Sequence, residues 1–283
     1  MPELPEVETI ARGLNQRIAG DVIESVWLGE KPEPLKSSAG EIASVLERAR
    51  IAQVRRVGKH IVFDLQPSRR NAAKKKAAMH GQWIVHLGMT GRLLIASPEL
   101  AMPKHTHAVL KLSSGQELRF VDPRRFGRLA VVRMETKGAA GFAAPGQEPL
   151  QSQFDTFVAL FRDRKTPIKS ALLNQRLLSG VGNIYADESL FRAGVRPRRR
   201  AASLTGAELR KLRSSLQAVL RQAVKLGGSS VNDYVDAEGR EGFFQLRHQV
   251  YGREGQPCRV CGTSIKRIII AGRSSHYCPR CQK

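Results

Sequence analysis

The feature that most constrains the fold is a change in the spacing of apolar residues after residue 134. Between residues 22 and 133, short apolar runs are separated by turn residues, and within several of these runs apolar and polar residues alternate. Such runs predict strands over 23–28, 51–57, 61–65, 83–87, 92–96, 108–112, 117–121 and 129–133. Helical patterns over 5–18 and 39–49 accompany them. The pattern favours a sandwich or barrel of about eight strands with flanking helices.

After residue 151 the apolar residues follow a helical period instead. Helices are expected over 154–161, over 168–173 and from Asn183 to Gly194. A fourth helix begins with the capping-box pair Thr205 and Glu208 and continues as a regular stripe of leucines, valines and alanines. A stripe of that kind is core and not a ligand site. The chain therefore combines a β-sandwich domain with a helical domain, which is an α+β multidomain fold.

Composition places the domain boundaries. Residues 135–151 are rich in Gly, Ala and Pro, and they are interpreted as a linker between an N-terminal domain over 1–134 and a helical domain over 152–245. Residues 246–283 form a separate C-terminal module. Within the first domain, the basic stretch 66–82 lies between two expected strands and favours a solvated loop over a site.

All four cysteines lie in this C-terminal module, as Cys258, Cys261, Cys278 and Cys281. The spacing C-x2-C-x16-C-x2-C is typical of one structural zinc ion held by four thiolates, with no open coordination position. Two disulfides or an iron–sulfur cluster are the alternatives, and no cysteine is left over for another bridge. Thiols kept for a metal fit a reducing cytosol. The basic segment between the pairs predicts a hairpin that presents Arg273 to DNA, or one that merely holds the C-terminus.

Charge indicates the class of partner. Lys and Arg number 47 against 25 Asp and Glu, which gives a net charge of +22. Binding to a polyanion such as nucleic acid is the natural interpretation, because neutralised phosphates release counterions. An unspecific cationic surface is the alternative. No apolar run is long enough to span a membrane, and the acidic N-terminus is unlike a signal peptide, so we expect a cytoplasmic, nucleoid-associated protein.

The first residues carry candidate chemistry. Residues 1–30 hold six acids and only two arginines, an unsuitable composition for gripping phosphate. If Met1 is removed, the free terminus is the secondary amine of Pro2, next to the carboxylate of Glu3. Such an amine attacks an electrophilic sugar carbon and forms a cationic imine, and a terminal amine with a pKa of about 8 is partly neutral near pH 7.

Three loop motifs could meet nucleic acid. Gly180-Val-Gly-Asn183 precedes an expected helix, whose N-terminus could bind phosphate with Asn183 as its cap, although a plain helix–helix turn would also use glycine. The turns His86-Leu-Gly-Met-Thr-Gly91 and Asp122-Pro-Arg-Arg-Phe-Gly-Arg128 carry Met89 and Phe126. Both side chains could be core, or wedges that enter the base stack when a base is flipped out.

Six motifs in order carry a family resemblance over essentially the full length. They are PELPEVET, HLGMTG, DPRRFG, GVGNIYADESLF, VYGREGQPCRVCG and YCPRCQK. Together they resemble bacterial formamidopyrimidine-DNA glycosylase. The resemblance implies an N-terminal catalytic β-sandwich, a helix–two-turn–helix domain and a C-terminal zinc finger. It also implies a bifunctional enzyme that removes oxidised purines, chiefly 8-oxoguanine and formamidopyrimidines, and then nicks the abasic strand by β,δ-elimination.

The resemblance assigns roles residue by residue. Pro2 would attack C1′ and form the imine, Glu3 would donate and accept protons, and Lys59 and Arg273 would serve the first and second eliminations. Glu6 would position groups near the pocket. The DNA-contacting positions would be His105, Arg124, Arg164, Lys169 and Asn183, and the trio filling the space of the flipped base would be Met89, Arg124 and Phe126. Arg164 stands where the family commonly has lysine, the 66–82 stretch exceeds the usual hairpin, and the 228–244 loop lies where the family closes over the base.

Two other functions remain open at this point. One is the sister class that acts on oxidised pyrimidines, similar to endonuclease VIII, which shares the Pro-Glu start but usually lacks a leucine at position 4. The other is a zinc-bearing protein that binds damaged DNA without catalysis, which intact Pro2, Glu3 and Lys59 disfavour. The expected partner is double-stranded DNA with oxidised purines or abasic sites. We expect a monomer, because no apolar stripe is left unused.

Overall fold

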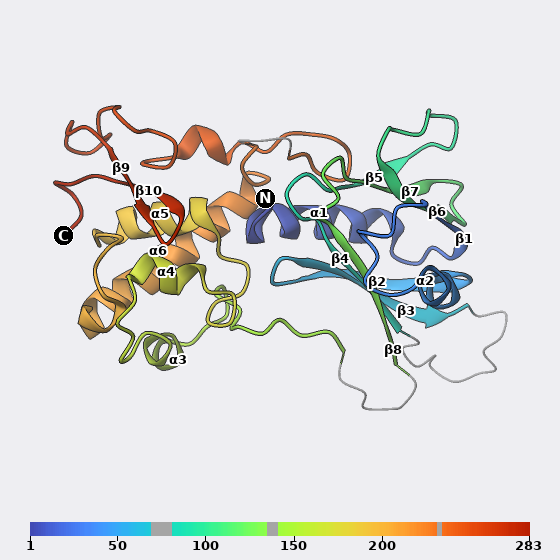
Figure 1. The fold of residues 1–283 in the computed structure, drawn as a ribbon, viewed down its shortest axis with the longest axis horizontal. Helices are drawn as coiled ribbons and strands as arrows, with labels where there is room; N and C mark the ends of the chain where they lie inside the picture. The colour runs from blue at the N-terminus through green and yellow to red at the C-terminus, as the bar shows by residue number, and fades with distance from the viewer. Residues whose placement is uncertain (69–80, 135–140, 231–233) are drawn as a thin grey trace. The chain divides into compact units, whose positions relative to one another are not determined.

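The computed structural model describes residues 1–68, 81–134, 141–230 and 234–283, and the chain forms two compact units (Figure 1). The first unit comprises Met1–Pro2, Glu6–Ala143 and Ser229–Gly242. The second comprises Glu3–Pro5, Ala144–Gly228 and Phe243–Lys283. Most of the 66–82 stretch, part of the expected linker and residues 231–233 lie outside the described residues.

The described residues of the first unit form two antiparallel sheets of four strands each. One sheet has the order β1-β6-β7-β5, with bounds Ile23–Leu28, Thr106–Leu112, Glu117–Val121 and Arg92–Ala96. The other has the order β2-β3-β4-β8, with bounds Ala49–Val57, His60–Pro67, Gly81–His86 and Arg128–Arg133. The prediction of a sandwich of about eight strands is confirmed within the described residues, and the observed ends differ from the expected ones by at most a few residues.

One apolar core joins both sheets and two helices of this unit. Helix α1 (Leu4–Ile18) buries Val7, Ile10 and Leu14, which recur at the three- and four-residue spacing of a helix face. Helix α2 (Ala39–Leu46) begins at a capping box of Ser38 and Glu41 and packs on β1, β4 and β8. The three buried residues of α1 and the buried side chains of α2 belong to the same cluster as the inward-facing strand side chains, among them Phe63, Trp83 and Phe120.

The second unit is mainly helical. Its helices are α3 (Phe154–Ala159), α4 (Ile168–Leu173), α5 (Asn183–Ala193) and α6 (Gly206–Lys225), with short 3-10 turns η2 (Ala201–Ser203) and η3 (Phe244–Arg247). Helix α6 packs on α3 and α5, and α4 packs on α5. The predicted capping box at Thr205 and Glu208 is confirmed, and hydrogen bonds from Arg199 and from the Thr205 amide lower the pKa of Glu208 to about 2.

The cysteine module ends the second unit and contains a two-stranded hairpin of β9 (Lys266–Ile270) and β10 (Arg273–Tyr277). Its two turn residues, Ala271 and Gly272, both have positive φ, at 46° and 72°. Two such residues form the tight turn whose twist matches that of antiparallel strands. The hairpin predicted between the cysteine pairs is therefore present, with Arg273 as the first residue after its turn.

Candidate active site

The residues after Pro2 are anchored to the loop that precedes α5. The Leu4 amide donates a 2.9 Å hydrogen bond to the Gly180 carbonyl oxygen, and the Leu4 side chain is fully buried. Gly180 has a φ of +92°, and an added Cβ there would lie 2.9 Å from the Leu4 Cβ. Only glycine fits this conformation and this contact, so the first glycine of the GVGN motif fixes the start of α1.

The carboxylate of Glu3 lies at the N-terminus of α5. It accepts hydrogen bonds from the amides of Ile184, at 3.2 Å, and Tyr185, at 3.5 Å, and the side chain is only 5% exposed. The first amides of a helix have no partner within the helix, and the helix dipole favours negative charge there. The helix end expected to bind phosphate thus already holds an anion that the protein supplies.

The prediction that Asn183 caps α5 is wrong. The N-cap residue is Gly182, which makes no side-chain cap bond, and Asn183 is the first helical residue. Its side-chain amide nitrogen instead lies 3.3 Å from the Ser274 hydroxyl on β10. The sequence around Asn183 does not reveal this, because the group that satisfies the helix amides, Glu3, comes from 181 residues away.

Gly182 is needed for a steric reason. A Cβ at this position would lie 2.1 Å from the Cδ atom of Glu3 and 2.3 Å from its Oε1 atom. Because real contacts are never that short, any larger residue would displace the carboxylate. The second glycine of the motif therefore keeps Glu3 on the α5 amides.

Lys59 occupies the tight turn between β2 and β3 and is 8% exposed. Next to it, the rings of His60 and His86 lie 4.9 Å apart, and Phe142 contacts the His60 ring at 4.7 Å. Burial lowers the pKa of both histidines, and in His86, where the positive charges of His60 and Lys59 add to the effect, the pKa falls to about 4. Both rings are therefore neutral near pH 7.

Burial of His86 predicts that the free energy of unfolding depends on pH, and that His86→Gln removes the part of this dependence that is due to His86. Because the folded-state pKa of His86 lies below its ordinary 6.5, the stabilisation is complete above pH 6.5 and is lost as the pH falls towards 4. At 1.36 kcal/mol per pKa unit, the loss is at most about 3 kcal/mol. Urea unfolding at several pH values should give a stability difference between wild type and variant that shrinks on acidification. A constant difference would contradict a neutral, buried His86.

The loops that carry Met89 and Phe126 are tied together by Asp122, which is fully buried. One carboxylate oxygen of Asp122 accepts a 2.6 Å hydrogen bond from the Thr90 hydroxyl, and the other accepts a 2.7 Å bond from the Gly127 amide. An added Cβ at Gly88 would lie 2.5 Å from the Phe126 carbonyl carbon, so the two backbones touch. The role of Asp122 was missed in the sequence, where it was one letter of a turn motif.

The predicted trio comes together on these loops. Met89 is 43% exposed and Phe126 is 52% exposed, which excludes the alternative that they are core residues. The Arg124 guanidinium lies 4.8 Å from the centre of the Phe126 ring. His105, also exposed, has its carbonyl oxygen 3.0 Å from the Asp122 amide. The structure therefore gathers four of the predicted DNA-contacting residues around one buried carboxylate.

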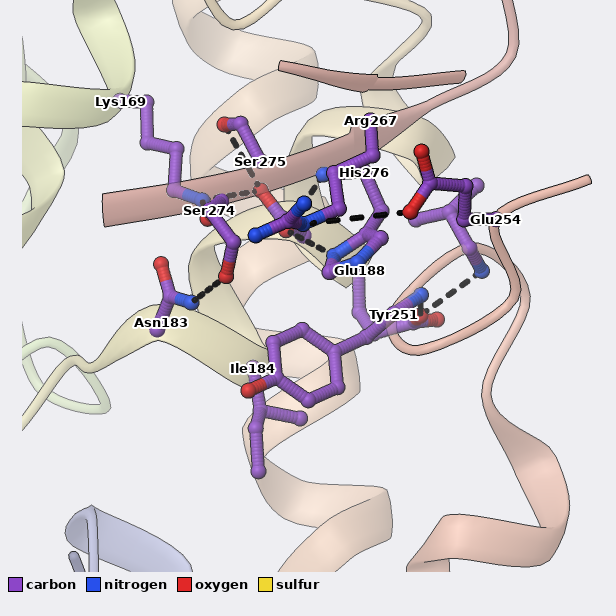
Figure 2. A network of polar contacts seen from close by, with 12 residues as sticks. Lys169, Asn183, Ile184, Glu188, Tyr251, Glu254, Arg267, Ser274, Ser275 and His276 are labelled. Carbon is purple, nitrogen blue, oxygen red and sulfur yellow. Dashed lines mark hydrogen bonds and ion pairs between the residues drawn. The ribbon is translucent and has the colours of Figure 1, made fainter. Parts of the chain in front are cut away.

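The predicted residues of the second unit lie in different surroundings. Arg164 and Arg273 are exposed, and the Arg164 side chain donates to the Leu160 carbonyl oxygen at the end of α3. Lys169 is fully buried, lies beside Ser274 of β10 (Figure 2), and forms a 2.7 Å ion pair with Asp187. Burial lowers the pKa of Lys169, and the carboxylate of Asp187 opposes the shift.

Glu6 holds one end of the 228–244 loop. Its carboxylate accepts a 2.8 Å hydrogen bond from the Ser229 amide, and the side chain is 2% exposed. Its backbone carbonyl lies 3.4 Å from the hydroxyl of Tyr234, whose pKa is raised by burial and by the Glu6 charge. Glu6 thus contacts both sides of residues 231–233, consistent with the positioning role that the resemblance implies.

The four cysteine sulfurs lie within 4.8 Å of one another. The Sγ atoms of Cys258 and Cys281 are 3.9 Å apart, and those of Cys261 and Cys278 are 3.5 Å apart. Four sulfurs bound at about 2.3 Å to one tetrahedral zinc ion would be about 3.8 Å apart. Backbone amides also point at two of these sulfurs, from Val260 to Cys258 and from Cys281 to Cys278. The donor set and its spacing fit one structural zinc ion.

Replacing Cys278 by serine should release the zinc and abolish tight DNA binding together. The module has few apolar residues of its own, so the metal supplies much of its folding free energy. Zinc per chain is measured by mass spectrometry, and binding by fluorescence anisotropy with a labelled duplex. Val260→Ala, an exposed site in the other knuckle, is the matched control and should change neither. Tight binding by a zinc-free variant would break this link.

Three family models match successive parts of the chain. The N-terminal domain of formamidopyrimidine-DNA glycosylase matches residues 1–129, and the H2TH domain of that enzyme matches residues 146–235. A zinc finger found in FPG and IleRS matches residues 255–283. Among the helices of the described residues, none is long and apolar enough to cross a membrane.

Comparison with whole proteins identifies the same family as the three family models. The chain is 43% identical to the formamidopyrimidine-DNA glycosylase of Solibacter usitatus, with all of both chains covered. A crystal structure of a Lactococcus lactis FPG variant with DNA containing Fapy-dG matches with a TM-score of 0.86 at 32% identity, again over all of both chains. MutM in complex with DNA containing carbocyclic 8-oxo-G matches with a TM-score of 0.85, also at 32% identity and full coverage of both chains. The chain belongs to the formamidopyrimidine-DNA glycosylase family.

Proposed function

We propose that this protein removes 8-oxoguanine and formamidopyrimidines from double-stranded DNA and then cleaves the strand at the resulting abasic site. Relatives with the same fold bind DNA containing Fapy-dG and 8-oxo-G. The observation that carries the proposal is the Glu3 carboxylate, held by two amides of α5 directly beside the residue whose amine would react. A fixed carboxylate next to a nucleophile is the arrangement that proton transfer requires.

In the proposed reaction Pro2 is the nucleophile. Its nitrogen attacks C1′, the glycosidic bond breaks, and the base leaves with a proton. The C1′–O4′ bond then breaks, the sugar ring opens, and O4′ takes up a proton that Glu3 supplies or relays, while the nitrogen lone pair forms the C1′=N bond. The resulting cationic imine withdraws electrons from the sugar, so that a proton can leave C2′ and the 3′ phosphate can depart. Lys59 serves this first elimination. Arg273 serves the second one, and its guanidinium acts by charge because it does not give up a proton near neutral pH.

The remaining residues bind and shape the DNA. We assign phosphate contacts to His105, Arg124 and Arg164, and the space of the flipped base to Met89, Arg124 and Phe126. Their exposure supports these assignments. Lys169 and Asn183 also belong to the proposed DNA-binding set. Because Lys169 is buried, it would affect DNA binding indirectly, by holding strand β10 through the Ser274 carbonyl oxygen.

The wider organisation is proposed on the same basis. We keep a catalytic domain over 1–134, a linker over 135–151, a helix–two-turn–helix domain over 152–245 and a zinc finger over 246–283. Their order agrees with that of the family models. We further propose a monomer, because the sequence leaves no apolar stripe unused. We also propose that it lies in the cytoplasm in association with the nucleoid, because the net charge of +22 favours binding to DNA.

The test is covalent trapping with borohydride. The protein is incubated with otherwise identical duplexes that contain 8-oxoguanine opposite cytosine, thymine glycol or only undamaged bases, and the reduced adduct is resolved by gel electrophoresis. We expect an adduct with 8-oxoguanine and none with the undamaged duplex. An adduct with thymine glycol alone would favour the oxidised-pyrimidine class. Binding to damaged DNA without any adduct would favour a non-catalytic damage-binding protein.

A further inference from the structure

The outer edge of strand β10 is covered by side chains instead of a third strand. On its inner side, β10 pairs with β9, so that Ser274 faces Ile269 and His276 faces Arg267. The outer edge of such a hairpin leaves backbone amides and carbonyls that need partners when they are buried. Ser275 and His276 are buried, so the edge of this strand cannot rely on water.

An ion pair supplies the missing partners. The Lys169 ammonium, from α4, lies 2.5 Å from the Ser274 carbonyl oxygen, and a carboxylate oxygen of Asp187, from α5, accepts a 2.8 Å bond from the His276 amide. The two side chains also bind each other at 2.7 Å. One donor and one acceptor thus meet alternate residues of β10, as the backbone of a neighbouring strand would.

Further contacts hold Ser274, Ser275 and His276 of β10, which Figure 2 labels. The Ser275 hydroxyl and the His276 ring lie 3.4 Å and 3.3 Å from the Asp187 carboxylate. The Asn183 amide nitrogen lies 3.3 Å from the Ser274 hydroxyl. Since Asn183 and Asp187 are one helical turn apart on α5, the strand is fixed to one face of that helix.

Stability alone does not explain the use of charge at this place. Both partners are fully buried, and an ion pair without access to water is often no better for folding than an apolar pair of similar size. An apolar pair, however, could neither donate to the Ser274 carbonyl nor accept from the His276 amide. What the charged pair adds is therefore a fixed position for β10.

The position of β10 matters because of the residue that begins it. Arg273 directly precedes Ser274, so fixing the Ser274 carbonyl fixes the backbone from which the Arg273 side chain extends. The same helix, α5, holds the Glu3 carboxylate on its amides at Ile184 and Tyr185. One helix is thus the common support for the acid/base carboxylate and for the strand that carries Arg273.

We propose that Asp187, paired with Lys169, is a positioning residue that sets the place of Arg273 for the second elimination. The inference rests on the proposed function. In that step a proton leaves C4′, a double bond forms between C4′ and C5′, and the C5′–O bond breaks with its electron pair leaving on the phosphate. Arg273 stabilises the charge that develops on this phosphate, and that effect depends on its distance from the phosphate oxygens.

The experiment uses a duplex with a single abasic site, so that base excision plays no part. The readout is the ratio of strands cut by both eliminations to strands cut by the first alone. This ratio does not depend on how much of a preparation is folded. The main variant is Lys169→Met with Asp187→Leu, which keeps the volume and leaves no charge buried alone. Zinc per chain is measured on the same samples.

We expect the double variant to retain one zinc per chain and to lower the ratio about tenfold, in line with the cost of small misplacements of a reacting group. Arg273→Gln is the benchmark and should lower the ratio at least as far. Glu254→Gln is the matched control, because it breaks an exposed ion pair to Arg267 on β9 and leaves the β10 edge intact. It should leave the ratio unchanged.

Each other outcome has one meaning. If Arg273→Gln leaves the ratio unchanged, the role of Arg273 in the proposed function is wrong. If Arg273→Gln lowers the ratio and the double variant does not, the positioning role of Asp187 is overturned while the proposed function survives. Loss of zinc by the double variant would also overturn it, because the pair would then support the whole module and not the place of one arginine.

Discussion

Replacing Pro2 by glycine should abolish the borohydride adduct with 8-oxoguanine DNA. The glycine amine is primary, so the imine it forms can lose its proton and become neutral, whereas the imine of proline stays cationic and continues to withdraw electrons. Glycine also lacks the ring that restricts the backbone of residue 2. The adduct is quantified on gels at equal protein concentration, after DNA binding by the variant has been shown by anisotropy.

A second form of the chain separates the amine from the side chain. A removable peptide placed before Pro2 leaves the proline in place but turns its amine into an amide, which is not nucleophilic. This form should give no adduct, and removal of the peptide to expose Pro2 should restore trapping. Adduct formation by the blocked form would show that another group is the nucleophile.

Much of the fold could be predicted because it depends on local patterns. Alternating runs such as Val109-Leu-Lys-Leu112 predict strands, since one face of each is buried, and Thr205 with Glu208 predicts a helix start by bonds three residues apart. The cysteine spacing predicted the four-sulfur cluster for the same reason, because each pair closes a short local loop. Element ends were less accurate, since they are decided by neighbours in space.

The site was predicted largely from the family resemblance, and its supports were not. Nothing local to Glu3 indicates that its carboxylate lies on the amides of a helix 181 residues away. The same limitation applies at Asn183: its place before a helix predicts a cap, whereas the helix end is occupied by Glu3, which lies far away in the chain. Asp122 and Asp187 were also missed, because a buried carboxylate is recognised by its partners and not by its neighbours in the chain.

Replacing Gly182 by alanine should lower base excision about 10²- to 10⁴-fold, the usual contribution of a general acid or base. The backbone of Gly182, at φ −130° and ψ −166°, is open to any residue, so alanine introduces no backbone strain. Its Cβ, however, would occupy the place of the Glu3 carboxylate. The carboxylate must then leave the α5 amides. Excision is measured under single-turnover conditions on 8-oxoguanine duplexes, with zinc content as a check on folding.

A double-mutant cycle shows whether the loss passes through Glu3. In a Glu3→Ala background the atoms that collide with the new Cβ are absent, so adding Gly182→Ala should cost little further activity or stability. In the wild-type background the same change should also destabilise the fold by about 1–3 kcal/mol, the usual cost of overpacking. Equal effects in both backgrounds would mean that Gly182 acts on something other than the carboxylate. The second glycine of the motif would then have to be explained by its contact with DNA, as its place before a helix first suggested.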